Sequence, residues 1–187
     1  MDLASAILTG LGLAAAAGLN AYIPLVIVGF LQYFNIVDFG APFDNLANPW
    51  VLGVLVVLLL VEVLADKIPA VDSVNDVIQT VVRPAAGAVL FAASTSLGTD
   101  IPPVVSLIAG LITAGTVHGT KAAVRPVLNA GSAGVAAPVV STGEDIVSTA
   151  LSFAAILAPF LVLLALVAFV WLVVRWLRKR RREPLPG

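Results

Sequence analysis

The sequence contains no cysteine, so it can form no disulfide bond, no thiolate metal site and no cysteine nucleophile. Charged residues are also scarce, at 11% of the chain against roughly 25% in an average soluble domain. His118 is the single histidine, which disfavours a transition-metal site. Hydrophobic residues make up 60% of the chain, and its mean hydropathy is +1.06. This composition predicts a membrane chain that has no cofactor and no room for a separate soluble domain.

Basic residues are few before Val174 and abundant after it. Residues 1–174 hold four basic and ten acidic groups, whereas residues 175–187 hold six basic groups and one acidic group. Such a basic run directly after an apolar segment is typical of a cytoplasmic flank; contact with anionic lipid headgroups is the alternative. We expect one transmembrane domain over residues 1–177 and a basic cytoplasmic tail over 178–187.

The first hydrophobic block, Leu3–Phe34, is longer than a bilayer core if it forms one helix. Its start resembles a secretory signal, but Asp2 stands where such a signal carries basic residues, which favours a retained membrane segment. Gly18 and Pro24 weaken the helix around Asn20. The block therefore predicts two half-helices broken at Asn20, with a kinked single helix as the alternative.

The segments after residue 34 differ in length and hydropathy. Trp50–Ala65 and Val104–Arg125 predict strong membrane helices, and Asp145–Leu177 predicts a long final helix. Ser73–Val82 has an apolar stripe at helical spacing but is too short to span, so it predicts a short amphipathic helix. Its polar face is acidic and suits protein or a wet cavity better than lipid headgroups. Val127–Thr142 is weakly apolar and can cross only if protein surrounds it.

Charge placement favours six crossings with both termini inside. That arrangement requires residues 127–142 to cross, near the centre of the protein. It puts Lys67, Arg83, Lys121 and Arg125 inside. The acidic positions Asp38–Asp44, Asp100 and Glu144–Asp145 then lie outside. The expected fold is an all-α polytopic bundle of about five to six transmembrane segments, with broken or re-entrant helices and one short amphipathic helix.

Spacing within the helices also makes predictions about contacts. Gly115-x-x-x-Gly119 is a spacing that lets helices approach closely. Glu62 and Asp66 are four residues apart and share one helix face. His118, Lys121 and Arg125 share another face, at i, i+3 and i+7. We expect the two charged faces to pair, either as a structural lock or as a proton- or ion-coupled solute site.

The candidate ligand- or ion-binding residues combine these charges with the polar breaks in the chain. In this scheme Glu62, Asp66 and Asp76 serve as proton or cation sites. Arg83, Lys121 and Arg125 serve as anion contacts, and the breaks at Asn20 and Asn129 supply backbone polar groups. The full set is Asn20, Glu62, Asp66, Lys67, Asp72, Asp76, Arg83, His118, Lys121, Arg125, Asn129, Glu144 and Asp145. No catalytic residue and no metal ligand is assigned.

The leading hypothesis is a small transporter or channel-like protein for a polar or anionic solute, with proton coupling as one form. The alternative is a non-catalytic accessory or assembly subunit of a larger membrane complex. A membrane enzyme that depends on His118 ranks third, so we expect no enzymatic activity. The expected surroundings are a lipid bilayer and a homo-oligomer or larger complex, with no nucleic acid.

Several stretches resemble a bacterial integral-membrane family catalogued as domain of unknown function 4126. They are Gly18–Leu25, Glu62–Pro69, Val71-Asp72 running to Arg83-Pro84, His118–Lys121 through Arg125-Pro126 and Asn129, and Pro138 through Ser141–Asp145. The resemblance covers about residues 5–175, and the Ala65–Pro69 and His118–Lys121 segments are its more specific parts. It implies a multi-pass protein of the bacterial inner membrane; the cytoplasmic C-terminus is expected from the basic tail, which lies outside the matching stretches. The family label records no activity, so it assigns no catalytic residue.

Overall fold

The computed structural model describes residues 2–40, 42–66, 69–96, 99–132 and 136–164, with 167, 168, 171 and 175; the side chains of residues 69–74, 126–132 and 136–137 are not described. All regular structure in this part of the chain is helical. Its helices are α1 (Leu3–Leu19), α2 (Tyr22–Tyr33), the 3-10 turn η1 (Phe43–Ala47), α3 (Pro49–Ala65), α4 (Pro69–Thr95), α5 (Pro103–Ser132) and α6 (Ala136–Leu157). The expectation of an all-α bundle is confirmed.

The two half-helices expected around Asn20 are present. Asp2 starts α1 by accepting a hydrogen bond from the Ser5 N–H at 2.9 Å, a bond that also lowers the pKa of Asp2. The helix stops at Asn20, whose backbone is extended. Pro24 falls in the first turn of α2, where its missing N–H costs no helical hydrogen bond. The single kinked helix is therefore wrong.

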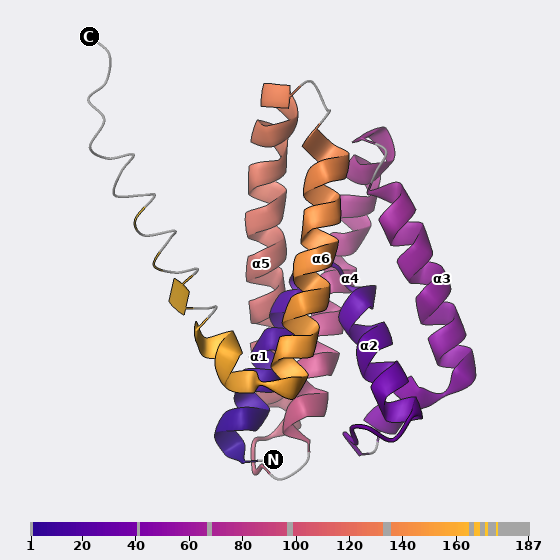
Figure 1. Ribbon diagram of the computed structural model, residues 1–187, viewed down its shortest axis with the longest axis vertical. Coiled ribbons are helices and arrows are strands. Elements are labelled where there is room, and N and C mark those ends of the chain that lie inside the picture. Colours follow the sequence, from indigo (N-terminus) through magenta and orange to yellow (C-terminus); the bar gives the residue numbers. More distant parts are fainter. Residues whose placement is uncertain are drawn as a thin grey trace.

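The pair α1 and α2 forms a re-entrant hairpin. Figure 1 shows α1 rising from the lower end of the molecule and α2 returning to it from about mid-height. Asn20 is 1% exposed and Ala21 is fully buried, so protein surrounds the non-helical turn. Irregular backbone at membrane depth needs such surroundings because the hydrocarbon offers no hydrogen-bond partners.

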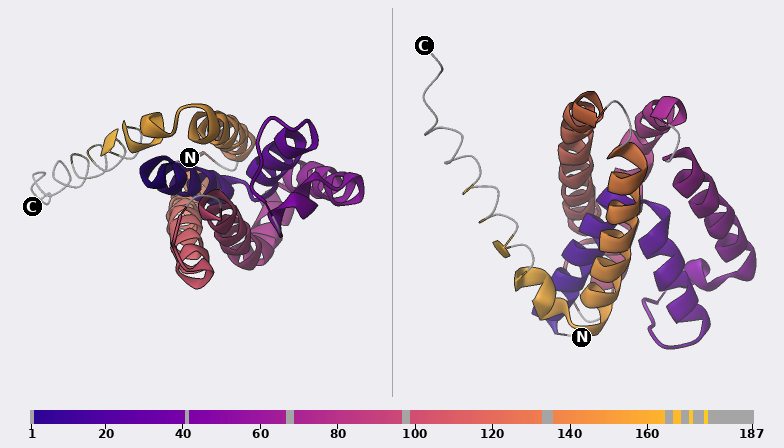
Figure 2. Two further views of the ribbon diagram at one scale, coloured as in Figure 1. Left: turned by 90° about the horizontal axis from the view of Figure 1, so that it is seen from below. Right: turned by 45° about the horizontal axis from the view of Figure 1, so that its top comes forward.

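The helix α1 lies at the centre of the bundle. Seen from below in Figure 2, it lies between α6 on one side and α4 and α5 on the other. Its buried face consists largely of alanine and glycine, including Ala14, Ala17 and Gly18. These small residues let the neighbouring helices approach closely. The central place expected for residues 127–142 thus belongs to α1.

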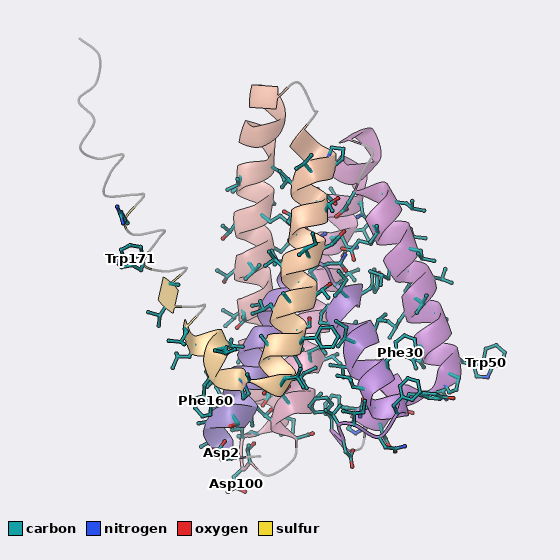
Figure 3. All side chains as sticks on the ribbon, in the orientation of Figure 1. Asp2, Phe30, Trp50, Asp100, Phe160 and Trp171 are labelled. Carbon is teal, nitrogen blue, oxygen red and sulfur yellow. The ribbon has the colours of Figure 1, made fainter. Side chains whose placement is uncertain are left out.

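Within the described residues, three helical segments are long and apolar enough to cross a membrane: Asn75–Thr95, Pro103–Arg125 and Pro138–Leu157. The helix α3 has 17 residues, at the lower end of the range of about 17–25 for a spanning helix. Large apolar side chains such as Leu60, Val77 and Ile112 are exposed on the outer faces of α3, α4 and α5. This surface suits a lipid bilayer. Trp50, which is 87% exposed, projects outward from the lower end of α3 (Figure 3), a position typical of the membrane interface.

Three expectations about element boundaries are wrong. Ser73–Val82 is not a separate short helix, because α4 continues through Pro84 to Thr95. Residues 127–142 are not a crossing of their own, because α5 runs to Ser132 and α6 begins at Ala136. The long final helix is interrupted at Ala158, directly before Pro159, which disfavours a helical conformation at its predecessor. The basic tail, 178–187, lies outside the described residues.

Candidate functional site

The charged residues that the sequence singles out meet in the upper half of the bundle. We name as the charge cluster the ionisable residues from α3, its C-cap, α4, α5 and α6 that contact one another there, together with Asp145, which is bonded to Asn20 beside them. The members are Glu62, Asp66, Asp76, Arg83, His118, Lys121, Arg125, Glu144 and Asp145. Glu62 is 1% exposed, and Arg83 is completely buried. Charged groups at this depth cost several kcal/mol each unless they are paired.

Arg83 is the hub of the cluster. Its Nη2 and Nε donate to Oε1 of Glu62 at 2.9 and 3.3 Å. Nη2 also lies 3.7 Å from Asp66 Oδ2, and Nη1 lies 3.8 Å from Asp76 Oδ1. The pairing differs from the expectation that Glu62 would meet the charged face of α5. Its partner comes instead from α4, which packs beside α3 at this level.

The contacts of His118 define its tautomer. Nδ1 lies 3.0 Å from Arg83 Nη1, and because a guanidinium can only donate, Nδ1 accepts and carries no proton. Nε2 lies 3.2 Å from Thr80 Oγ1, whose hydroxyl donates to the Asp76 carbonyl at 2.8 Å. Nε2 is therefore the protonated nitrogen. This arrangement holds a neutral imidazole beside the guanidinium, and a second proton on His118 would break the contact with Arg83.

Glu144 joins the two cations of α5. Its Oε2 lies 2.9 Å from both Lys121 Nζ and Arg125 Nη2. The same two cations lie 3.7 and 3.5 Å from Asp66 Oδ2, and Arg125 Nη1 is 3.6 Å from Asp76 Oδ2. The expectation that Glu144 and Asp145 lie on the opposite side of the membrane from Lys121 and Arg125 is wrong. The helix α5 ends at Ser132 and α6 begins at Ala136 at the same end of the molecule (Figure 1), so residues 127–142 do not cross and both ends stay on one side.

The hairpin break is bonded directly to the cluster. Lys121 Nζ donates to the Leu19 carbonyl at 3.1 Å. Leu19 is the last residue of α1, so its carbonyl has no N–H donor within the helix, and Lys121 supplies one. Asn20 Nδ2 donates to Asp145 Oδ1 at 2.9 Å. Asn20 Oδ1 accepts from the N–H groups of Tyr22 and Ile23, both at 3.1 Å, and so caps the start of α2.

The cluster has more acid than base. Among the described side chains, four carboxylates pair with the fixed cations Arg83, Lys121 and Arg125, and Asp145 lies beside them, bonded to Asn20. Three buried oxygens at the cluster have no hydrogen-bond partner among the described residues: Glu62 Oε2, Asp76 Oδ1 and Gln79 Oε1. A buried acceptor without a donor is costly. The excess negative charge and the open Glu62 oxygen make this a place where protons can be taken up.

A groove of about 270 Å³ opens beside the cluster, between α5, α6 and the end of α1. Its lining combines apolar side chains with the Lys121–Arg125–Glu144 group: Leu19, Thr116, Val117, Thr120, Lys121, Val124, Arg125, Val140 and Glu144. The cations on its inner side are buried, whereas Val124 on its outer side is 47% exposed. The groove thus leads from the apolar outer surface to the charged interior.

The structure brings most of the candidate site residues together, and their role in binding stays a prediction. The side chains of Asp72 and Asn129, and Lys67 as a whole, lie outside the described residues. Sequence reasoning did not assign Asn75, which donates to Asp66 Oδ1 at 2.8 Å, or Thr80, which positions His118. Both residues lie on the polar face of Ser73–Val82, which indicates a polar environment for their side chains. The sequence does not show which side chains that face contacts.

Comparison with known proteins places this arrangement in a family and nothing more specific. No curated protein and no solved structure matches the chain. A family model described as a domain of unknown function, DUF4126, matches residues 7–179. That match covers the hairpin, all helices that contribute to the charge cluster, and the groove. The chain therefore belongs to the DUF4126 family.

Proposed function

We propose that this protein is a small membrane transporter that carries an anion together with protons. The observation that carries the proposal is the buried charge cluster, with four described carboxylates paired to three fixed cations, Asp145 beside them, and the unpartnered Glu62 oxygen. An anion that enters such a site adds to an existing excess of negative charge. Proton uptake by the carboxylates compensates that charge, so anion and proton binding favour each other.

Burying these charges costs free energy, which is unfavourable if the only role of the cluster is to hold the helices together. Apolar residues of similar volume can hold helices at least as well as buried ion pairs. The cluster also connects to the re-entrant break through Lys121 and Asn20, and a broken helix at membrane depth is a recurrent feature of transporter binding sites. In the proposed mechanism Arg83, Lys121 and Arg125 contact the anion. Glu62, Asp66 and Asp76 take up protons, and the scheme involves no catalytic step.

The charge distribution supports an orientation. The loops at the lower end of the molecule carry the acids Asp38, Asp44 and Asp100, with Asp2 beside them (Figure 3). The positive-inside rule then favours a cytoplasmic position for the opposite end, where the cluster lies. The same rule favours a cytoplasmic position for the basic residues from 175 to 182. We place the protein in the bacterial inner membrane, with its C-terminus in the cytoplasm.

The test is proton movement driven by an anion gradient. The full chain is reconstituted into liposomes with entrapped pyranine, and inward gradients of lactate, succinate, gluconate and inorganic phosphate are imposed with the membrane potential clamped. We expect at least one anion to acidify the lumen faster than in protein-free liposomes. Glu62→Gln and Arg125→Gln should abolish the effect, whereas Asp44→Asn, exposed and outside the cluster, should not.

Two results would overturn the proposal. One is unchanged proton flux in folded Glu62→Gln and Arg125→Gln proteins. The other is the absence of flux with every anion together with a stoichiometric larger partner in gentle detergent, which would support the accessory-subunit alternative.

A further inference from the structure

The groove beside the charge cluster has a lining that is mostly apolar, with charged residues along its inner side. Leu19, Val117, Val124 and Val140 line it with apolar surface. Thr116 and Thr120 also line it, but their hydroxyls donate to the Ile112 and Thr116 carbonyls of α5, each at 2.8 Å. Their hydroxyl protons are therefore already engaged within the helix. Lys121, Arg125 and Glu144 supply the charge in this lining.

The groove suits one short chain better than a two-chain lipid. At about 270 Å³ it lies just below the range of roughly 300–1,000 Å³ for clefts that hold drug-sized ligands. The lining positions on α5 run from Thr116 to Arg125, about 13 Å at 1.5 Å per residue. That length matches an extended chain of roughly eight carbons with its head at Lys121 and Arg125.

We infer that the groove binds an amphiphilic monoanion, a free single-chain carboxylate of medium length. Its chain lies against the valines and Leu19, and its carboxylate accepts hydrogen bonds from Lys121 and Arg125. Both cations now share one oxygen of Glu144. The ligand carboxylate becomes a second anionic partner of these two cations beside Glu144.

This inference rests on the proposed function, because it names the class of anion that the transporter carries. It also explains why the site opens toward an apolar surface. A medium-chain carboxylate partitions to the membrane and can reach Lys121 and Arg125 along the groove without crossing the polar end of the bundle.

Binding is measured directly with radiolabelled octanoate on the full chain in zwitterionic nanodiscs at neutral pH. We expect saturable binding that protein-free nanodiscs lack. In competition, each methylene between butanoate and octanoate should strengthen binding roughly three- to fourfold. Uncharged octanol should compete at least tenfold more weakly.

The matched variants are Val140→Trp and Val139→Trp. Val140 lines the groove, whereas its neighbour Val139 is 72% exposed and outside the lining. Filling the groove with Val140→Trp should weaken octanoate binding at least tenfold, and Val139→Trp should leave it unchanged. Val124→Phe, at the outer side of the groove, is a second groove-filling variant in case Val140→Trp does not fold.

Equal binding by the folded groove-filling and control variants would overturn the inference, as would equal competition by octanol. Loss of octanoate binding in nanodiscs that contain phosphatidic acid would show that a lipid headgroup occupies the groove, and would contradict a free carboxylate as its ligand.

The binding inference and the transport proposal can fail independently of each other. Flux of lactate with no octanoate binding refutes this inference alone, and octanoate binding with no proton-coupled flux of any anion refutes the transport proposal.

Discussion

At the scale of single residues, Asn20 links the hairpin to the charge cluster. Its carbonyl oxygen caps α2 and its amide nitrogen binds Asp145, so all three hydrogen bonds of this buried side chain are used within the protein. The flanking glycine and proline predicted a break at this position. The partner on α6 was not predictable, because Asp145 was expected on the other side of the membrane.

Asn20→Ala should lower the free energy of unfolding by about 1–3 kcal/mol, because it leaves buried N–H groups and Asp145 without their partner. Asn20→Asp keeps the cap but puts a carboxylate against Asp145, so its stability should be reduced at pH 7 and partly recover in acid. Thermal unfolding in detergent between pH 5 and pH 8 measures both. Asn45→Ala, at an exposed site, should change stability by less than about 0.5 kcal/mol. Equal stability of Asn20→Ala and the parent chain would contradict this role.

At the scale of helices, α4 and α5 approach each other at Gly87 and Gly110. A Cβ on Gly110 would meet the Gly87 carbonyl, and it would lie 2.7 Å from Phe91 Cβ. The predicted close approach at Gly115-x-x-x-Gly119 is wrong. A Cβ on Gly115 would meet Pro84 Cγ at an ordinary 3.8 Å, and one on Gly119 would meet nothing within 4 Å. Glycine spacing alone does not say which face of a helix meets a neighbour.

Gly110→Ala should therefore destabilise the protein by about 1–3 kcal/mol, because the methyl group forces the two backbones apart. Gly119→Ala should be neutral or stabilise the helix by up to about 1 kcal/mol, because alanine favours the helical state and space is available. Chemical or thermal unfolding of both variants in the same detergent gives the comparison. Similar stability of the two variants would contradict the packing.

The helix α3 is held mainly at its ends. Of its 17 residues only Leu52 and Glu62 are buried. Near its C-terminus it is held by the ion pairs of Glu62 and Asp66 with Arg83, Lys121 and Arg125. Figures 1 and 2 show it at the edge of the bundle. The charge cluster therefore controls how firmly this helix docks.

Glu62→Gln should loosen α3 without unfolding the bundle, because the amide retains little of the attraction to Arg83. Since the chain has no cysteine, spin labels can be attached to Leu64→Cys on α3 and Ile146→Cys on α6, both 64% exposed. The distance distribution between these labels should broaden in Glu62→Gln. A pair at Ile108 and Ile146, on α5 and α6, should stay unchanged. Equal broadening of both pairs would indicate general unfolding and would contradict a specific effect on α3.

At the scale of the whole molecule, the re-entrant hairpin decides the sidedness of the loops. Because α1 and α2 begin and end at the same end, the start of α1, the α2–α3 loop and the α4–α5 loop all lie at the lower end (Figure 1). The acidic loops at Asp38–Asp44 and Asp100 were expected on one side together, and the structure places them at the same end. The start of α1 was expected on the opposite side, and the hairpin reverses that expectation.

Single cysteines at Ser5, Asp44 and Asp100 should therefore react with an impermeant maleimide from the same side of the membrane. With the proposed orientation that side is the outside, so intact cells or right-side-out vesicles should label all three. A tag fused after Gly187 should be accessible only after permeabilisation. Labelling of Ser5→Cys from the opposite side to Asp100→Cys would exclude the re-entrant hairpin, and accessibility of the tag in intact cells would exclude the proposed orientation.

Local sequence determined a large part of this protein. Hydropathy determined the helical membrane character, the glycine and proline around Asn20 determined the break, and helical spacing determined which charges share a face. These are properties of a few consecutive residues, so they do not depend on how the helices pack against one another. The polar side of Ser73–Val82 facing protein follows in the same way, and Gln79, which is 2% exposed, confirms it.

Tertiary structure alone decided how these pieces meet. The packing of α6 beside α5 brings Glu144 to Lys121 and Arg125, and the packing of α4 beside α3 brings Glu62 to Arg83. A weakly apolar segment such as 127–142 has similar hydropathy whether it turns or crosses. Its path is set by the neighbours that satisfy its backbone and the adjacent charges. Contacts such as the Asp66–Arg125 ion pair and the Lys121–Leu19 hydrogen bond join residues far apart in the sequence, and no local pattern encodes them.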